Sequence, residues 1–396
     1  MIPRKETLED LISFKDKNLI KVVTGIRRCG KSTIFELYQN YLKEHGVRDE
    51  QIISINLEDG DYRDILTSKD LFEYVDIRLK KEHKNYIFLD EVQQVQNFQE
   101  GVDWLYAKKN VDLYITGSNA FLLSGELATL LSGRYVEIKM QPLSFKEYIL
   151  AYPNNSNMAE LYMNYLQNSS FPGTLELERK KDIRTYLEGI YNTILLKDIV
   201  TRKRISDPSM LQSVVEFIFD NIGNLCSSTK IANSMTTSGR KISVPTVESY
   251  LSALVDSFIV YKVGRYDIKG KQYLATGSKY YVADIGLRYY LLGTKHTDMG
   301  HILENIVYLE LLRRGYEVYV GKIGATEVDF IAINEEGKSY YQVSMTVMEN
   351  QTLKRELSSL EAIKDHNPKY LLTMDYTPLT SHNGIKQMNV LEWLVD

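Results

Sequence analysis

Short apolar runs alternate with segments of helical periodicity along the amino-terminal third of the chain. The runs favour strands at residues 19–23, 51–57, 85–91 and 113–119, and the segments between them favour helices at 7–16, 31–43 and 68–82. Short apolar runs bounded by polar residues are typical of strands, and apolar positions every three or four residues are typical of amphipathic helices. Strands that alternate with helices indicate an α/β fold built on a parallel sheet.

Helical periodicity then dominates residues 142–200, with a polar break at 153–157 and a turn at 171–173. Three more helices are expected at 211–219, 229–235 and 244–255, and the last of them is capped by Ser243 or Pro245. A β-ribbon follows at 259–263 and 279–282. Three helices followed by a β-ribbon is the order of a winged helix-turn-helix.

The last hundred or so residues form a further α-β-β-β pattern. The helix is expected at 302–312 and the strands at 317–320, 327–333 and 340–344. These changes of pattern predict four domains: an α/β core at 1–141, a helical domain at 142–203, a winged helix-turn-helix at 204–296, and a small α/β domain at 297–396.

Composition limits the kinds of protein that the chain can be. Of its 396 residues, 44% are hydrophobic and 25% are charged, as is ordinary for soluble globular proteins. No apolar run reaches the roughly 18–20 residues that cross a bilayer, and the charged amino terminus does not resemble a secretory signal. The two cysteines, Cys29 and Cys226, argue for a reducing compartment and against a disulfide framework. We therefore expect a cytoplasmic protein with no membrane partner.

The first strand runs into a glycine-rich loop with the sequence GIRRCGKS, and the next helix follows directly. This spacing, between a strand and a helix, is the phosphate-binding loop of nucleoside triphosphatases. Its glycines let backbone N–H groups face phosphate oxygens, and the positive end of the helix favours the same anions. The nucleotide-binding residues are therefore predicted to be Gly25, Ile26, Arg27, Arg28, Cys29, Gly30, Lys31, Ser32 and Thr33. The alternative, a plain glycine turn with a surface lysine, does not explain why motif and context agree.

Two acids, Asp90 and Glu91, end the third apolar run. Such a strand end is common on its own, but here it follows a complete phosphate-binding loop. Asp90 is expected to hold Mg²⁺ together with Ser32, and Glu91 to activate the attacking water. Lys31 is expected to contact the β- and γ-phosphates. The sequence thus predicts that the chain binds a nucleoside triphosphate and Mg²⁺.

Positive charge is concentrated in the winged-helix region. Residues 197–288 hold 13 Lys and Arg against 8 Asp and Glu, although the whole chain has a net charge of −4. Phosphate contacts are expected near the third helix and the ribbon, from Arg240, Lys241, Lys262, Arg265, Lys269, Lys271 and Lys279. Winged helices also serve as protein-interaction modules, so both DNA and protein stay open as partners.

The core also resembles the AAA+ ATPases, in which the strand after the acidic pair ends in a polar residue that senses the γ-phosphate. The resemblance implies Ser118 or Asn119 in this role, with Thr116 a weaker candidate, and Asn56 as the residue that restrains Glu91. It also implies that a helical lid follows the core. A polar cap at a strand end is the alternative for each of these residues.

In AAA+ proteins, a Gly-Arg pair at the place of Gly133 and Arg134 commonly supplies the arginine finger that acts on a neighbouring subunit's nucleotide. The resemblance therefore implies a homo-oligomer if Arg134 acts in trans. The alternative is an ion pair between Arg134 and Glu126 or Glu137.

Longer motifs resemble one prokaryotic family, the AAA-family ATP-binding proteins that carry a carboxy-terminal domain of uncharacterised function. They include VVTGIRRCGKST, YIFLDEVQQV, the turns at 142–145 and 171–173, and EVDFIA with YYQVS near the carboxyl end. The likeness covers nearly the whole chain, and it implies ATP as the nucleotide.

The carboxy-terminal pattern resembles the restriction-endonuclease-like nucleases, whose acids hold Mg²⁺ and whose lysine stabilises charge at the phosphate. Glu304 and Asp329 match the two acids, but the later acid-x-Lys pair reads Gln342-Val343-Ser344. Because the lysine is absent there and the acid is an amide, we expect a vestigial site that binds a DNA end or a partner protein.

Taken together, the sequence predicts an ATP-hydrolysing AAA+ switch whose carboxy-terminal domains engage DNA or a partner according to nucleotide state. Three alternatives stay open: an ATP-dependent nuclease, a signalling or scaffold ATPase that binds protein only, and a nucleotide-gated switch that barely turns over.

Overall fold

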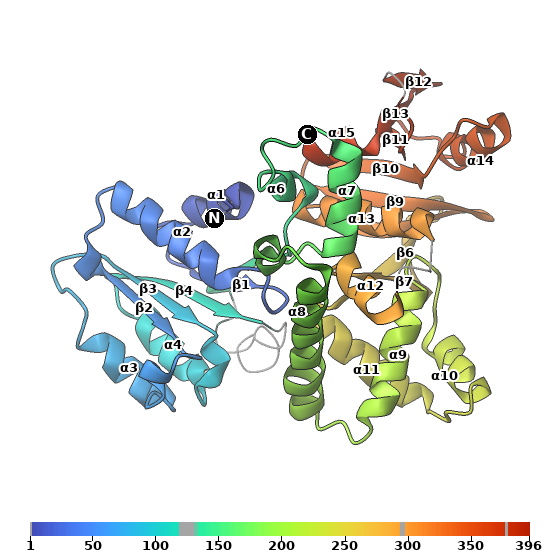
Figure 1. The fold of residues 1–396 in the computed structure, drawn as a ribbon. Coiled ribbons are helices and arrows are strands. Elements are labelled where there is room, and N and C mark those ends of the chain that lie inside the picture. Colours follow the sequence, from blue (N-terminus) through green and yellow to red (C-terminus); the bar gives the residue numbers. More distant parts are fainter. Residues whose placement is uncertain (1, 119–130, 132, 294–297, 377–378) are drawn as a thin grey trace. The chain divides into compact units, whose positions relative to one another are not determined.

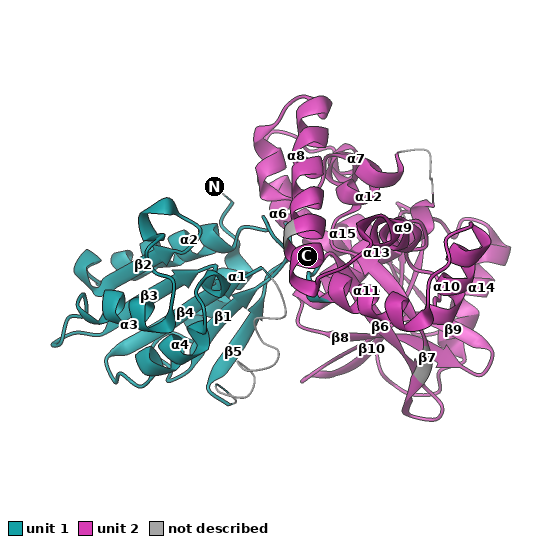
Figure 2. Ribbon diagram, turned by 90° about the horizontal axis from the view of Figure 1, so that it is seen from below, with its two compact units in different colours: residues 1–142, 256–258 teal, residues 143–255, 259–396 magenta. Residues whose placement is uncertain are grey.

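The computed structural model describes residues 2–118, 131, 133–293, 298–376 and 379–396. The chain divides into two compact units, which Figure 2 colours separately. Unit 1 comprises residues 1–142 and 256–258, and unit 2 comprises residues 143–255 and 259–396. No helix among the described residues is long and apolar enough to span a bilayer.

Unit 1 is an α/β layer structure on a five-stranded parallel sheet of order β2-β3-β4-β1-β5 (Figure 1). Its strands are β1 (Ile20–Thr24), β2 (Ile52–Asn56), β3 (Asn85–Asp90), β4 (Val111–Gly117) and β5 (Tyr135–Lys139). Its α-helices are α1 (Lys5–Ser13), α2 (Lys31–Glu44), α3 (Ser68–Asp76) and α4 (Phe98–Tyr106), and its short helices are η1 (Asp49–Gln51), η2 (Gly60–Tyr62) and η3 (Val92–Gln94). The α/β parallel-sheet core predicted from the sequence is confirmed.

Burial explains why the central strands were readable from the sequence. Every residue of β1 and of β3 is buried, as is usual for parallel strands covered on both faces. Alternate side chains face opposite layers. Ile87 and Leu89 of β3 join a cluster with Leu71 and Val102 of α3 and α4, whereas Phe88 packs on α2.

Unit 2 begins with helices. They are α6 (Phe145–Ile149), α7 (Met158–Asn168), η5 (Pro172–Glu176), α8 (Lys180–Asn192) and a π-helical segment, η6 (Thr193–Thr201). Next come α9 (Pro208–Asp220), α10 (Ser228–Thr237) and α11 (Val244–Asp256). Ser243 Oγ accepts the Thr246 N–H at 3.2 Å, so Ser243 caps α11. The helical reading of this region is confirmed.

The rest of unit 2 is organised on an eight-stranded mixed sheet of order β12-β13-β11-β10-β9-β8-β6-β7. The strands are β6 (Val260–Asp267), β7 (Gln272–Val282), β8 (Glu317–Ile323), β9 (Thr326–Asn334), β10 (Gly337–Ser344), β11 (Lys369–Thr373), β12 (Thr380–His382) and β13 (Ile385–Asn389). The helices are α12 (Ile285–Leu292), α13 (Met299–Arg313), α14 (Asn350–Glu361) and α15 (Val390–Val395).

The β6–β7 ribbon is part of this sheet, because β6 pairs in parallel with β8. The ribbon of the expected winged helix and the strands of the expected nuclease-like domain are therefore one continuous sheet. The boundary that we expect at residue 297 runs between strands of that sheet, and the four-domain division stays a prediction.

Candidate functional site

The loop from Gly25 to Gly30 lies at the carboxyl end of β1 and leads into α2. A Cβ on Gly25 would lie 2.0 Å from the Met140 carbonyl oxygen, so no larger residue fits between the loop and the end of β5. Gly30 has a φ of 104°, a conformation that favours glycine. The loop is also tied to the amino terminus, since Arg4 Nη1 donates to the Cys29 carbonyl at 3.1 Å. The backbone is thus held in one compact turn.

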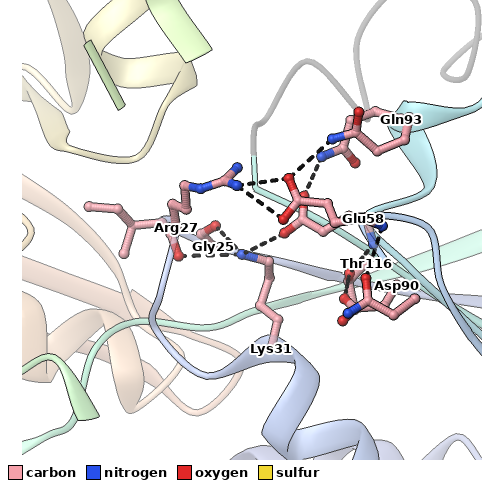
Figure 3. Close-up of polar contacts among 11 residues, drawn as sticks. Gly25, Arg27, Lys31, Glu58, Asp90, Gln93 and Thr116 are labelled. Carbon is pink, nitrogen blue, oxygen red and sulfur yellow. Dashed lines mark hydrogen bonds and ion pairs between the residues drawn. The ribbon is translucent and has the colours of Figure 1, made fainter. Parts of the chain in front are cut away.

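The Lys31 side chain is buried and folds back over this loop (Figure 3). Its ammonium donates to the carbonyl oxygens of Gly25 at 3.1 Å and Ile26 at 3.4 Å, and it lies 3.7 Å from Glu91 Oε1. Ser32 and Thr33 follow in the first turn of α2, where Ser32 is exposed. The lysine and the hydroxyl therefore stand at the positive end of a helix, which attracts phosphate.

The other loop residues divide between anchors and surface charges. Ile26 and Cys29 are fully buried, and burial raises the pKa of the Cys29 thiol above its ordinary value. Arg27 Nη2 donates to both carboxylate oxygens of Glu58, at 2.7 and 3.0 Å, and Arg28 points outward. The buried side chains of Ile26 and Cys29 and the ion pair of Arg27 thus anchor the loop.

Asp90 is the last residue of β3 and Glu91 follows it, and both lie close to the residues that begin α2. Thr116 and Ser32 donate hydrogen bonds to the Asp90 carboxylate. Burial raises the pKa of Asp90, although these hydrogen bonds and the Lys31 charge oppose the rise. Glu91 adopts a left-handed backbone with a φ of 53°, which is uncommon for a residue with a side chain. This turn carries the Glu91 carboxylate toward Lys31.

The sequence analysis did not identify the side chains that hydrogen-bond to these acids, and it gave Thr116 only as a weaker candidate for a different role. Thr116 Oγ1 contacts Asp90 and also accepts the Glu91 N–H at 2.9 Å. The Gln93 amide donates to Glu91 Oε2, and the neighbouring Gln94 amide donates to Glu58 Oε1 at 3.2 Å. Asn56 instead accepts the Glu58 N–H at 3.0 Å. The only sequence signal for the glutamines was their place just after the acidic pair.

The predicted γ-phosphate sensors follow β4. Ser118 is buried, and its hydroxyl has no hydrogen-bond partner among the described residues. Asn119 lies outside the described residues. The assignment of either residue as a sensor stays a prediction.

Arg134 immediately precedes β5, at the end of the sheet away from the phosphate-binding loop. Its carbonyl accepts the N–H of Ile20, the first residue of β1, at 2.8 Å, whereas the loop follows Thr24, the last. A strand of five residues spans about 16 Å. The guanidinium pairs with Asp103 at 2.5 Å, and Glu126, one acid of the alternative considered above, lies outside the described residues. The arginine-finger role stays a prediction.

The predicted DNA contacts lie in two turns of unit 2. Arg240 and Lys241 lie between α10 and α11, where Arg240 Nη1 also donates to Ser213 Oγ at 2.5 Å. Lys269 and Lys271 are exposed at the β6–β7 turn, and Arg265 is partly buried on β6. Lys262 is exposed on β6.

Lys279 differs from these residues, because only 4% of it is exposed. Its ammonium lies 2.8 Å from both Glu304 Oε1 and Glu327 Oε1. The prediction that Lys279 contacts phosphate was wrong, because its ammonium is buried and already paired with two glutamates.

The residues of the predicted vestigial nuclease site do approach one another. Glu304 of α13 accepts from Lys279 and from the Tyr281 hydroxyl, and Asp329 Oδ2 accepts the Val343 N–H at 2.8 Å. The Gln342 amide oxygen accepts the Asp329 N–H at 3.3 Å and its amide nitrogen donates to Glu356 at 2.8 Å. Within the described ranges, no group of three His, Cys, Asp or Glu side chains is placed to hold a metal. The vestigial nuclease site stays a prediction.

Two family models match successive stretches of the chain. The family model described as an AAA domain matches residues 17–149, and a model described as a domain of unknown function matches residues 159–298. An uncharacterized protein of Haemophilus influenzae is 41% identical over 399 residues, covering 100% of this chain and 99% of its own length. An uncharacterized protein of Methanocaldococcus jannaschii is 31% identical over 375 residues, covering 88% of this chain and 79% of its own length.

Among solved structures, a Walker-type ATPase of Pyrococcus abyssi is similar with a TM-score of 0.50 and 15% sequence identity. The match covers 74% of this chain and 96% of that protein, and at this identity it concerns the fold. The chain therefore belongs to the family of the Haemophilus influenzae and Methanocaldococcus jannaschii proteins, and its residues 17–149 are an AAA domain with the fold of a P-loop ATPase.

Proposed function

We propose that the protein binds and hydrolyses ATP in unit 1 and uses the nucleotide state to control how its carboxy-terminal domains engage DNA or a protein partner. One observation carries the hydrolytic part. Lys31, Asp90 and Glu91 lie together beside the carboxyl ends of β1 and β3. Lys31 and Glu91 are 3.7 Å apart, and Asp90 precedes Glu91 in the chain.

Each residue has a distinct task in this proposal. Lys31 neutralises charge on the β- and γ-phosphates, and the backbone of the Gly25–Gly30 loop orients the triphosphate. Glu91 orients the attacking water and accepts its proton. The Asp90 carboxylate accepts hydrogen bonds from Ser32 and Thr116, which suits it to holding the metal. The task of the base therefore falls to Glu91.

The residues also fit Mg²⁺. The Ser32 hydroxyl and the Asp90 carboxylate give an oxygen donor set, which is what this hard cation prefers, and substrate phosphates complete such sites in other proteins. When bound, the ion would neutralise negative charge that develops on the phosphate oxygens.

Engagement of DNA is a separate part of the proposal. Its support is the exposed basic residues at two turns, Arg240 and Lys241 after α10 and Lys269 and Lys271 at the β6–β7 turn. A protein-only partner is the second candidate, because the predicted winged helix can also serve as a protein-interaction module.

The test is ATP hydrolysis by the full chain with no DNA, with duplex DNA and with single-stranded DNA, using Glu91→Gln as the control. Turnover that DNA stimulates and that the variant loses supports the whole proposal. Turnover indifferent to DNA moves the function to a protein partner. Binding of ATP without turnover would overturn the hydrolytic role of Glu91.

A further inference from the structure

Thr116, which the AAA+ resemblance offers only as a weaker candidate for the γ-phosphate sensor, contacts both acids of the site. It lies on β4 between β1 and β3, and the register Leu89–Ile115 places it beside Asp90. Its side chain is fully buried. A threonine hydroxyl has one proton to donate and two lone pairs to accept with. The Thr116 hydroxyl makes both kinds of hydrogen bond, one as donor and one as acceptor.

The hydroxyl binds the two acids in different ways. It donates to Asp90 Oδ1, and it accepts the backbone N–H of Glu91 at 2.9 Å (Figure 3). The first bond fixes the rotation of the carboxylate that would hold the metal. The second fixes the peptide plane from which the Glu91 side chain departs. One oxygen atom therefore sets the orientation of both acids.

The backbone of Glu91 gives an independent reason why such a bond is needed. Its φ of 53° is left-handed, and residues with a side chain keep such a conformation only where their surroundings hold it. In this turn, the Glu91 Oε1 atom lies 3.7 Å from the Lys31 ammonium. Without the bond from Thr116, the Glu91 N–H would lose its partner and the turn could relax.

We propose that Thr116 is the positioning residue of the hydrolytic site: its hydroxyl holds Asp90 and the strained Glu91 turn together. The inference rests on the proposed ATPase function. It differs from a γ-phosphate sensor, because Thr116 acts through the two acids and its hydroxyl is committed to them. The expected defect is therefore in turnover and in the use of Mg²⁺, with the affinity for ATP little changed.

The test compares Thr116→Val, which keeps the shape and removes the hydroxyl, with Thr116→Ser, which keeps the hydroxyl and removes the methyl. Thr373→Val is the matched control, because Thr373 is also a fully buried strand threonine and its hydroxyl has no hydrogen-bond partner among the described residues. The measurements are kcat and KM for ATP, the Mg²⁺ concentration that gives half the maximal rate, binding of a fluorescent ATP analogue, and thermal unfolding.

Thr116→Val is expected to lower kcat about 10- to 100-fold, the loss of a hydrogen bond to a charged group. Its KM should stay within about threefold of wild type, as for an interaction that matters in the transition state. Half-maximal activity should need more Mg²⁺. Thr116→Ser should keep kcat within about threefold, and Thr373→Val should match wild type.

The proposal is overturned if Thr116→Ser loses as much turnover as Thr116→Val, because the methyl group would then be what matters. It is also overturned if Thr116→Val keeps its kcat. Should the valine variant unfold, Thr116→Ala, which also lacks the hydroxyl, takes its place in the comparison with Thr116→Ser.

Failure of the proposed function looks different, because the wild-type chain would then bind the ATP analogue without turnover. In that case the Mg²⁺ dependence of binding decides. A shift to higher Mg²⁺ in Thr116→Val, absent in Thr116→Ser, supports the positioning of Asp90, and equal Mg²⁺ dependence in all variants overturns it.

Discussion

Lys279 donates a hydrogen bond of 2.8 Å to Glu304 Oε1, and both side chains are less than one-tenth exposed. Burial alone would lower the pKa of Lys279, but the carboxylates of Glu304, Asp329 and Glu327 outweigh it and raise that pKa above its ordinary value. The ammonium is therefore charged in the folded protein. It supplies the positive charge among these acids.

Removal of the Lys279 charge should destabilise unit 2. Lys279→Met leaves Glu304 buried without its cationic partner, and breaking a buried pair in this way costs about 3–5 kcal/mol. The double variant Lys279→Met with Glu304→Gln should recover part of the loss, because the buried Glu304 charge that Lys279 paired is then removed as well. Thermal unfolding of the full chain measures both effects.

Lys262→Met is the control for this prediction, since Lys262 is exposed on β6 and its loss should change stability by less than about 0.5 kcal/mol. Equal melting temperatures for Lys279→Met and Lys262→Met would show that the buried pair contributes nothing.

Asp329 should make unit 2 less stable as the pH rises. Burial, followed by the charge of Glu304, raises the pKa of Asp329 well above its ordinary value of about 3.9. Between these two pKa values the folded state binds a proton that the unfolded state has lost, so the free energy of unfolding falls with increasing pH.

Asp329→Asn removes this titration and still offers an oxygen to the Val343 N–H. We expect the variant and the wild type to melt alike near pH 4, and the variant to melt at the higher temperature near pH 8. A melting difference that stays constant from pH 4 to pH 8 would contradict the raised pKa.

Gly25→Ala should prevent formation of the phosphate-binding loop in its present shape. The new Cβ would lie 2.0 Å from the Met140 carbonyl oxygen, so the loop or β5 must move. Overpacking typically costs roughly 1–3 kcal/mol, and here the displaced atoms belong to the nucleotide site. We expect loss of ATP-analogue binding together with a lower melting temperature.

Gly189→Ala is the matched control. Gly189 lies in α8 with nothing within 4 Å of an added Cβ, so alanine should stabilise this helix by about 0.5–1 kcal/mol. Unchanged ATP-analogue binding by Gly25→Ala would show that the loop has room for a side chain.

The contrast between unit 1 and unit 2 shows what a single sequence can reveal. The strands β1 and β3 were predictable because they are continuous apolar runs, and the loop because its spacing is dictated by phosphate geometry. β5 was not predicted, because YVEIK is a half-polar edge strand with little apolar signal. The local pattern therefore decides how well a strand can be predicted.

Side-chain partners distant in sequence were beyond such reasoning. Thr116 was underrated because its hydroxyl meets Asp90 only through the register of β3 with β4. Lys279 was taken for a surface charge because its partners Glu304 and Glu327 come from a later helix and strand. In both cases the missing information is the tertiary pairing that decides whether a polar group is exposed.

Arg134 should act, if it is an arginine finger, on the nucleotide of another molecule. It precedes β5 and its carbonyl bonds to Ile20, at the start of β1, so the length of β1 separates it from its own phosphate-binding loop. Arg134→Ala should then keep ATP binding and lose about 10³- to 10⁵-fold in turnover. Arg179→Ala, which removes another exposed arginine paired with a nearby acid, should leave turnover unchanged.

Mixing two inactive variants tests the direction of this action. Glu91→Gln keeps its arginine and lacks the base, whereas Arg134→Ala keeps the base and lacks the arginine. In a mixed assembly, an Arg134→Ala molecule that lies beside a Glu91→Gln molecule regains a complete site, so turnover should return when the two are combined. Activity that stays absent in every mixture, although the variants assemble together, would show that Arg134 does not act in trans. Arg134 would then act within its own molecule, where it pairs with Asp103.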